Sequence, residues 1–397
     1  MIKSNAIKGI MGVAVAGVFV GALAFTGLSQ AGATSTESTD SSITEATYQD
    51  WKSAYPDQYG SFATHYYDHV DGDEESHFQF RYKQDAYGTA STRTGACMSC
   101  KSTVATDLYE EYGDDFFSLS IEETDAENKA EAYWDCQVCH TSIDDLTLGT
   151  NLLVFNAFGS KEFAGVDEEI LVCGQCHNAS GAWTYNVSSD APLTSWDPYR
   201  YGHDADAMYK AYTEDMGTVD EETGATLSTL SYDDLEMYVD STHASLGLTC
   251  VDCHMTTTMD GNGNEFTSHN ASSSPLENPE ALAKCVECHS AEGIETAEDM
   301  LTFYSDVESE LASAMDQALA VQEQLHDALV EATAAGTEGD DIDQARECYA
   351  QVYFFNQYVN SYRCNDRYRV AHNADYMNEL AARMLNLAQQ GLELMQA

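Results

Sequence analysis

The chain of 397 residues is long enough for two to three domains, and its 43% hydrophobic and 21% charged residues are typical of a globular protein. Asp and Glu number 67 against 17 Lys and Arg, which gives a formal net charge of −50. Such a negative field repels nucleic acid and anionic lipid, which argues against both as partners. The charge suits either a soluble surface outside the cytoplasm or the attraction of a basic redox protein.

Residues 1–33 have the pattern of a signal peptide. Two lysines precede an apolar run over residues 10–28, and the Ala-Gly-Ala sequence at residues 31–33 offers a cleavage site. The run is near the lower limit for a membrane span, so an uncleaved anchor is the alternative. Residues 34–47 are rich in Ser, Thr and acidic residues and are expected to form a flexible linker. We therefore predict export to the periplasm or to the extracytoplasmic cell surface.

Ten of the twelve cysteines form five C-x-x-C pairs, and a histidine directly follows each of the last four pairs. The pairs are Cys97 and Cys100, Cys136 and Cys139, Cys173 and Cys176, Cys250 and Cys253, and Cys285 and Cys288, and the histidines are His140, His177, His254 and His289. C-x-x-C-H is the attachment sequence of haem c, because two thiols one helical turn apart reach the two vinyl groups of a porphyrin and the adjacent imidazole reaches the iron. Zinc ribbons or disulfides do not require a histidine at this position four times over. The sequence therefore predicts four covalent haems with histidine ligands.

The first pair, Cys97 and Cys100, is followed by Lys101 instead of a histidine. Lysine is scarce, with nine residues in the chain, so we expect its deprotonated amine to bind the iron of a fifth haem; a C-x-x-C pair unrelated to haem is the alternative. Of the 12 histidines, eight remain for the opposite faces of the four His-ligated haems, and the face opposite Lys101 stays open. An open iron binds exogenous molecules, whereas closed bis-histidine haems pass single electrons, so the arrangement is that of a multi-electron reductase.

The predicted fold class is mainly α with extensive irregular loops, as a multihaem cytochrome c domain over residues 48–295 followed by a C-terminal bundle of long helices. The haem domain is rich in Gly, Ser, Thr and Asp, and the porphyrins would supply much of its core. Residues 296–397 are expected to form helices over 301–332, 342–362 and 374–394, because apolar residues recur there every three or four positions. The bundle packs on the haem domain or forms a dimer interface.

The first of these helices carries an apolar seam, formed by Leu301, Tyr304, Leu311, Met315, Ala318, Leu325, Leu329 and Ala332. Two cysteines, Cys348 and Cys364, remain outside the C-x-x-C pairs. On one helix they would lie roughly 24 Å apart, at about 1.5 Å per residue, which is beyond the reach of a disulfide. No bridge between them is expected.

The motifs together resemble those of the pentahaem, ammonia-forming cytochrome c nitrite reductases (cytochrome c552). The order of one C-x-x-C-K and four C-x-x-C-H motifs is similar to that family, as are the forms Cys-Gly-Gln-Cys-His at the third motif and Cys-Val-Asp-Cys-His-Met at the fourth. The resemblance runs from residue 56 to the C-terminal helices. It implies five haem c groups, nitrite bound at the open face of the Lys101 haem, its six-electron reduction to ammonium, a homodimer, and a redox donor protein such as a membrane quinol-oxidising cytochrome.

The resemblance also implies which histidines occupy the opposite haem faces. His269, in Thr-Ser-His-Asn, matches the family's ligand of the second haem, and His77, in Ser-His-Phe, matches that of the third. His372, in Ala-His-Asn-Ala-Asp-Tyr, matches the ligand of the fourth haem, and His243 matches that of the fifth. The histidines left for the surface are His65, His69, His203 and His326.

Around the open iron, Arg93 in Arg-Thr-Gly-Ala resembles the family's substrate-binding arginine, whose guanidinium would hold an oxyanion. The family's Glu-Tyr pair after the third motif is replaced by Asn-Ala-Ser at residues 178–180, and its Lys-x-Gln-His run is replaced at residues 227–232. The family's usual calcium ligands are missing as well, so no calcium ion is assigned. Two functions remain: reduction of nitrite or hydroxylamine at the Lys101 haem, or relay of electrons to a separate exported reductase by a scaffold that has lost the pocket.

Overall fold

The computed structural model describes residues 48–68, 95, 99, 103–120, 123, 136–153, 155, 160–179, 199, 201–230, 233–271, 274–360 and 368–396. They all belong to one compact unit, residues 43–397. The predicted signal peptide and linker lie outside the described residues. Among the described helices, none is both long enough and apolar enough to span a membrane.

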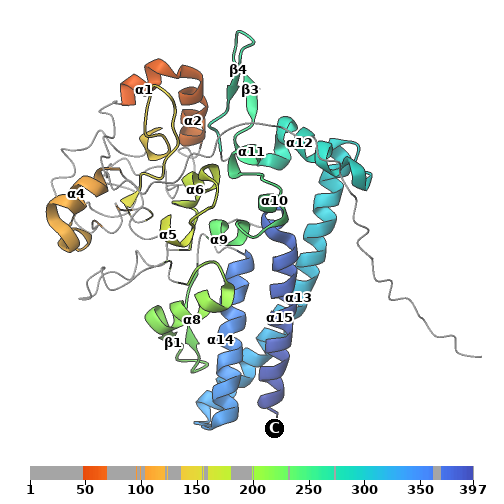
Figure 1. Ribbon diagram of the computed structural model, residues 1–397. Coiled ribbons are helices and arrows are strands. Elements are labelled where there is room, and N and C mark those ends of the chain that lie inside the picture. Colours follow the sequence, from red (N-terminus) through yellow and green to blue (C-terminus); the bar gives the residue numbers. More distant parts are fainter. Residues whose placement is uncertain are drawn as a thin grey trace, which may run out of the picture. The chain divides into compact units, whose positions relative to one another are not determined.

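The fold is mainly α with long irregular connections, as predicted (Figure 1). The described α-helices are α1 (Tyr48–Ala54), α2 (Pro56–Asp68), α4 (Val104–Tyr112), α5 (Ser160–Glu162), α6 (Glu168–Gly174), α8 (Ala205–Met216), α9 (Asp234–Tyr238), α10 (Thr242–Ser245), α11 (Cys250–His254), α12 (Pro279–His289), α13 (Ala297–Ala334), α14 (Asp340–Asn360) and α15 (Val370–Leu394). Short 3-10 helices are η3 (Gly113–Phe117), η5 (Cys136–Val138), η8 (Pro275–Glu277) and η9 (Ser290–Glu292). Two antiparallel hairpins pair β1 (Thr218–Val219) with β2 (Thr226–Leu227) and β3 (Thr257–Met259) with β4 (Glu265–Thr267).

A small aromatic core supports the first half of the described chain. Phe155, Phe163 and Tyr199 are buried and touch one another, with ring centroids 5.9 or 6.2 Å apart. Leu108 of α4 and Ile170 of α6 pack into the same cluster. This core therefore holds α6, the helix that leads into the third cysteine motif.

The segment that carries the last two motifs, residues 242–299, buries few apolar side chains. Neither α10 nor α11 buries any residue, and α12 buries Ala281 and Leu282. Ile294 is the one further buried apolar residue in the described part of this segment. Burial of apolar surface is the main driving force of folding, so this segment depends on apolar contacts beyond those of its own side chains.

The C-terminal helices agree with the predicted ones, with small shifts at their ends. α13 begins at residue 297 rather than 301 because Thr296 and Asp299 form a capping box: Asp299 N donates to Thr296 Oγ1 (3.1 Å) and Thr296 N donates to the Asp299 carboxylate (3.0 Å). It ends just before Gly336, whose φ of 69° lies in the left-handed region. α14 begins and ends two residues before the predicted 342–362.

The regular part of α15 begins after residue 373, as predicted, because the helix is interrupted at Asn373 (φ −170°, ψ 75°). The Asn373 side chain donates to Met237 O (3.1 Å) and accepts from Tyr376 N (3.3 Å). It therefore caps the longer part of the helix. His372 lies just before this kink, apart from the regular helix.

The apolar seam of α13 packs against other helices of the same chain. α13 packs along α14 and α15 (Figure 1). Five seam residues are fully buried there: Leu311, Met315, Ala318, Leu325 and Leu329. The inclusion of Leu301 in the seam is wrong, because its side chain is 40% exposed and the neighbouring Met300 is buried instead. Since the chain's own helices cover the seam, it is not available to a second copy.

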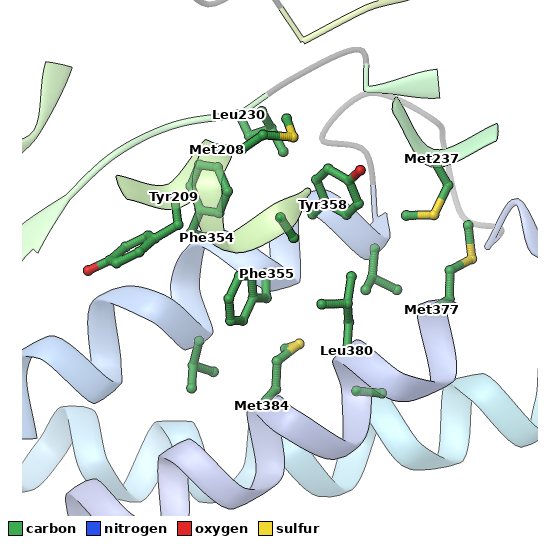
Figure 2. Close-up of a cluster of buried hydrophobic side chains, with 14 of the residues drawn as sticks. Met208, Tyr209, Leu230, Met237, Phe354, Phe355, Tyr358, Met377, Leu380 and Met384 are labelled. Atoms are coloured by element: carbon green, nitrogen blue, oxygen red, sulfur yellow. The ribbon is translucent and has the colours of Figure 1, made fainter. Parts of the chain in front are cut away.

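The main hydrophobic core joins the C-terminal helices to the segment before them (Figure 2). Phe354, Phe355 and Tyr358 of α14 are fully buried in a cluster with Leu380 and Met384 of α15. Buried side chains from before residue 296 belong to the same cluster, and Figure 2 labels four of them: Met208, Tyr209, Leu230 and Met237. The predicted haem domain and the helical region thus share one core, which attaches α8 and α9 to the bundle.

A second core of the bundle contains Cys348, which is buried beside Leu325 and Tyr349. A Cβ atom on Gly391 of α15 would lie 3.1 Å from Cys348 Cβ and 2.6 Å from Leu325 Cδ2. Only glycine at this position lets the three helices approach so closely. Cys348 forms no disulfide with any described cysteine. Cys364 lies outside the described residues, so the absence of a bridge between them stays a prediction.

Candidate functional site

Each of the last four cysteine motifs forms a helical turn that gathers two thiols and one imidazole. In the second motif His140 N donates to Cys136 O (2.9 Å), and in the third His177 N donates to Cys173 O (3.0 Å). The fourth motif is α11 itself, and the fifth ends α12. None of the described motif cysteines is paired in a disulfide, which is compatible with attachment of their sulfur atoms to vinyl groups.

Side-chain caps begin the helices that carry these motifs. The Asp167 carboxylate accepts from Glu169 N (2.9 Å) at the start of α6, and Asn278 accepts from Glu280 N (3.0 Å) at the start of α12. Thr249 Oγ1 donates to Glu169 Oε2 (2.9 Å). This last bond ties the start of α11 to α6, so the third and fourth motifs are held together.

The structure brings the motif histidines next to distant histidines wherever both members of an expected pair are described. The ring centroids are 6.2 Å apart for His140 and His269, 6.4 Å for His254 and His372, and 6.3 Å for His289 and His243. The distant members come from the strand end after β4, from α15 and from α10. The expected partner of His177, His77, lies outside the described residues.

In most of these histidines Nδ1 lies next to a hydrogen-bond acceptor, so Nε2 is the ring nitrogen that remains for a metal. Backbone oxygens face Nδ1 of three of them, at 3.1 Å (His140 and Leu146), 3.0 Å (His269 and Thr267) and 2.8 Å (His243 and Ala371). Carboxylates face two others, at 2.9 Å (His289 and Glu292) and 3.0 Å (His177 and Asp234). An acceptor at Nδ1 keeps the proton of a neutral imidazole there, so the lone pair of Nε2 is free for a metal.

Burial keeps three of the imidazoles neutral. It lowers the pKa of His140 and of His269. Burial, together with the charges of His372 and His177, lowers the pKa of His254 to about 4. At neutral pH these rings are therefore uncharged, which is the state that binds a metal ion.

A buried ion cluster lies beside two of these histidines. Asp234, the first residue of α9, has Oδ2 3.0 Å from His177 Nδ1 and Oδ1 3.4 Å from His372 Nδ1. The Arg369 guanidinium pairs with Asp234 and lies 3.4 Å from the fully buried Asp233 carboxylate. The cluster therefore joins the third motif to the chain segment just before the kink in α15.

The two carboxyl groups of this cluster differ in charge. Burial raises the pKa of Asp233 to about 7, against the opposing effect of Arg369. Burial acts on Asp234 as well, but Arg369 and the neighbouring His177 and His372 side chains outweigh it and hold the pKa of this carboxyl well below its usual range. Asp234 is therefore the carboxylate that stays charged beside the histidines.

The family model described as cytochrome c552 matches residues 53–397, which is most of the chain. The chain belongs to the cytochrome c552 family. The subunit NrfA of cytochrome c nitrite reductase from Nitratidesulfovibrio vulgaris (strain Hildenborough) is 27% identical to it over 289 residues, which cover 67% of this chain and 54% of that protein. The match thus spans about half the length of this curated relative.

A solved structure with a similar fold is that of cytochrome c nitrite reductase from Desulfovibrio desulfuricans ATCC 27774, whose catalytic subunit NrfA has two calcium sites. Its TM-score is 0.65, and the match covers 89% of this chain and 86% of that one at 19% identity. At this identity the likeness shows the fold. Both comparisons agree with membership of the cytochrome c552 family.

The segment after the third motif is tightly packed in this member of the cytochrome c552 family. Asn178 Nδ2 donates to Gly174 O (2.7 Å), and Asn178 Oδ1 accepts from Tyr199 OH (3.0 Å). Ala179 N donates to the buried Glu236 carboxylate (3.0 and 3.1 Å). Residues 178 and 179, which the family resemblance matches to a Glu-Tyr pair, therefore form hydrogen bonds within the protein core.

The segment before the fourth motif is also part of the protein core. Leu230 is fully buried, and its N–H donates to Gln357 Oε1 (3.1 Å). Gln357 Nε2 in turn donates to Ser228 O (3.2 Å). The family resemblance matches this stretch to a Lys-x-Gln-His run, and its residues Ser228 and Leu230 are bonded to α14. Ser231 and Tyr232 lie outside the described residues.

The residues around the expected open iron, Arg93, Cys97, Cys100 and Lys101, lie outside the described residues. Two of their neighbours are described. Gly95 and Ser99 are buried, and Ser99 N donates to Gly95 O (3.0 Å). A Cβ atom at residue 95 would lie 2.1 Å from Phe116 O, so the Arg-Thr-Gly-Ala sequence needs its glycine for close packing.

The expectation that His203 lies at the surface holds only in part. Its ring stacks on Phe163 (6.2 Å between centroids), and its Nε2 pairs with Asp240 at 2.8 Å. His326 is nearer to the expectation, since it is partly exposed beside Asp327 (3.3 Å).

Asp233, Asp234, Glu236 and Arg369 were not expected at the site. The chain has 67 acidic residues, so nothing in the sequence marks Asp233, Asp234 and Glu236 as members of the site. Arg369 could have been found from the sequence, because arginine is scarce in this chain and Arg369 lies three residues before His372.

Proposed function

We propose that this protein is an exported pentahaem cytochrome c that reduces nitrite to ammonium in a six-electron reaction, at a haem whose protein ligand is Lys101. Membership of the cytochrome c552 family supports the class of protein. The Lys101 position supports the site, because four of the five motifs have a histidine there.

The observation that carries the haem assignment is the set of three facing histidine pairs. A metal–imidazole bond of about 2.0–2.1 Å puts the ring centre about 3 Å from the metal, so two rings on one ion stand roughly 6 Å apart. The observed distances of 6.2, 6.3 and 6.4 Å fit one iron in each pair. The scarcity of buried apolar side chains in residues 242–299 fits porphyrins as well, since these would cover the segment.

The chain's own residues have separate roles in this proposal. Ten cysteines hold the porphyrins covalently, and the motif histidines with His77, His243, His269 and His372 close both faces of four irons. Lys101 binds the fifth iron from one side. When bound, the haems supply irons that carry electrons singly and one iron that accepts an exogenous ligand. Arg93 would pair with the negative charge of nitrite and orient it at that open face.

The test is steady-state reduction of nitrite and of hydroxylamine by the purified holoprotein with an artificial donor. We expect ammonium from both substrates, and carbon monoxide should perturb about one haem in five because one iron is open. A reduced protein that carbon monoxide leaves unchanged would mean that the Lys101 haem is closed, which contradicts the enzyme proposal.

Electron relay is the second candidate, and the packed segments around Asn178 and Leu230 favour it. Both stand where the family has pocket residues, and both are used in the protein core. The net charge of −50 also disfavours the entry of an anion. In this case the protein would turn over neither substrate and would exchange electrons rapidly with a basic redox protein.

We also propose the homodimer that the resemblance implies, through the part of α13 that the bundle leaves exposed. Leu301 and Phe303 are 40% and 37% exposed there. Light scattering at micromolar concentration should report a dimer, and Leu301→Asp should shift it toward monomer. The control is Val219→Asp, which changes an apolar residue of β1 that is 60% exposed and should have no effect. A monomeric wild type would contradict the proposal.

A further inference from the structure

Asp234 lies between histidines that belong to two different haem assignments. Its Oδ2 is 3.0 Å from Nδ1 of His177, in the third motif, and its Oδ1 is 3.4 Å from Nδ1 of His372, which pairs with His254 of the fourth motif. The Nδ1 atom of His372 is buried and completes no hydrogen bond with any described residue. The Asp234 carboxylate is therefore the hydrogen-bond acceptor that His372 Nδ1 can reach.

The backbone and one arginine fix this carboxylate in position. Leu235 N donates to His177 O (2.8 Å), which holds the start of α9 against the third motif. The Arg369 guanidinium pairs with Asp234 from the other side, and this arginine side chain is only 10% exposed. His372 N donates to Arg369 O (2.7 Å), so one turn of chain carries both the arginine and the second histidine.

The other histidine pairs lack such a shared group. His140, His243 and His269 face backbone oxygens, and His289 faces Glu292, three residues further along the same segment. Among the described residues, Asp234 is the one carboxylate that reaches ligands of two haems.

A carboxylate at Nδ1 makes an imidazole a stronger donor to its metal than a carbonyl does, because the carboxylate carries a charge. A more basic ligand and a nearby negative charge both favour the oxidised, more positive state of an iron. Asp234 would exert this effect on the irons held by His177 and by His372, with the electrons supplied by the external donor and no bond in the protein formed or broken.

We propose that Asp234, positioned by Arg369, couples the third and fourth haems, so that one carboxylate sets the reduction potentials of both. The inference rests on the proposed pentahaem function. It assigns Asp234 as a positioning and tuning residue that acts through His177 and His372.

The experiment is a spectroscopic redox titration of the holoprotein with dithionite and mediators, combined with electron paramagnetic resonance of the oxidised state. In Asp234→Asn, two of the five haems should shift to higher potential together and change their resonance signals, because a negative charge is lost. Glu292→Gln is the matched control, since it removes a charge that faces His289 alone and should shift one haem.

Arg369→Gln supplies a second variant that does not depend on the first. It removes a positive charge, so the same two haems should shift to lower potential. The proposal is overturned if Asp234→Asn moves one haem or none while five haems stay bound, or if Arg369→Gln leaves both potentials unchanged. A wild type with fewer than four His-ligated haems would instead contradict the proposed function.

Discussion

Replacement of Arg93 by alanine should lower nitrite turnover by about ten- to hundredfold, because a lost charge-assisted contact to an anion costs about 1.5–3 kcal/mol. The haem spectra should stay unchanged, since Arg93 is not expected to bind an iron. Hydroxylamine is neutral and offers no charge to pair, so its reduction should be less affected. Steady-state rates with both substrates measure the difference.

Two further variants sharpen this test. Arg93→Lys keeps the charge but loses the planar fork of donors, so its turnover should fall between those of wild type and alanine. Arg383→Ala is the control, because it removes an arginine that pairs with Asp206 (2.5 Å) at the bundle surface. Its nitrite turnover should stay within about twofold of wild type. Equal losses for nitrite and hydroxylamine in Arg93→Ala would mean a structural role for Arg93.

Replacement of Phe355 by alanine should destabilise the helical bundle by about 3–5 kcal/mol, the range for deletion of a buried aromatic ring. Phe355 is fully buried, lies 6.3 Å from the Tyr209 ring, and supports the Arg383 guanidinium 4.8 Å above its face. The cavity left by the ring would open between α14, α15 and α8. Guanidinium unfolding followed by circular dichroism measures the loss.

Val219→Ala is the control for this measurement. Val219 lies on β1 and is 60% exposed, so its truncation should cost about 1 kcal/mol or less. Similar losses for the two variants would contradict the central position of Phe355 in the core. Because α8 packs on Phe354 and Phe355, the Phe355 variant should also loosen the contact between the bundle and the segment before it.

Local chemistry could be predicted from the sequence because it depends on residues a few positions apart. A C-x-x-C-H motif needs only five residues to form its turn, and the helical turns from Cys136 to His140 and from Cys173 to His177 follow from this spacing. The long helices were predictable for the same reason, since an apolar residue every three or four positions defines a buried face. The ends of these helices lie within a few residues of the predicted ones, and at the start of α13 the cause of the shift is a local cap, Thr296 with Asp299.

The pairing of His243, His269 and His372 with motif histidines was implied by the family resemblance and not by spacing. Nothing in their immediate sequences distinguishes them from His203, which packs on Phe163 instead. Their positions depend on contacts between segments far apart in the chain, such as the Asn373 side chain that bonds to Met237 O and sets the kink beside His372.

The sequence by itself determined the five C-x-x-C motifs, the lysine that follows the first of them, the acidic charge and the helical C-terminal region, because each is a property of composition or of short spacing. Only the tertiary structure decided that the α13 seam is covered within the chain, that Leu230 belongs to the bundle core, and that Asp234 reaches both His177 and His372. These facts depend on which faces meet when distant segments pack, and packing energy is shared among many residues rather than encoded in one pattern. In so acidic a chain, the burial of one carboxylate beside Arg369 is visible only in three dimensions.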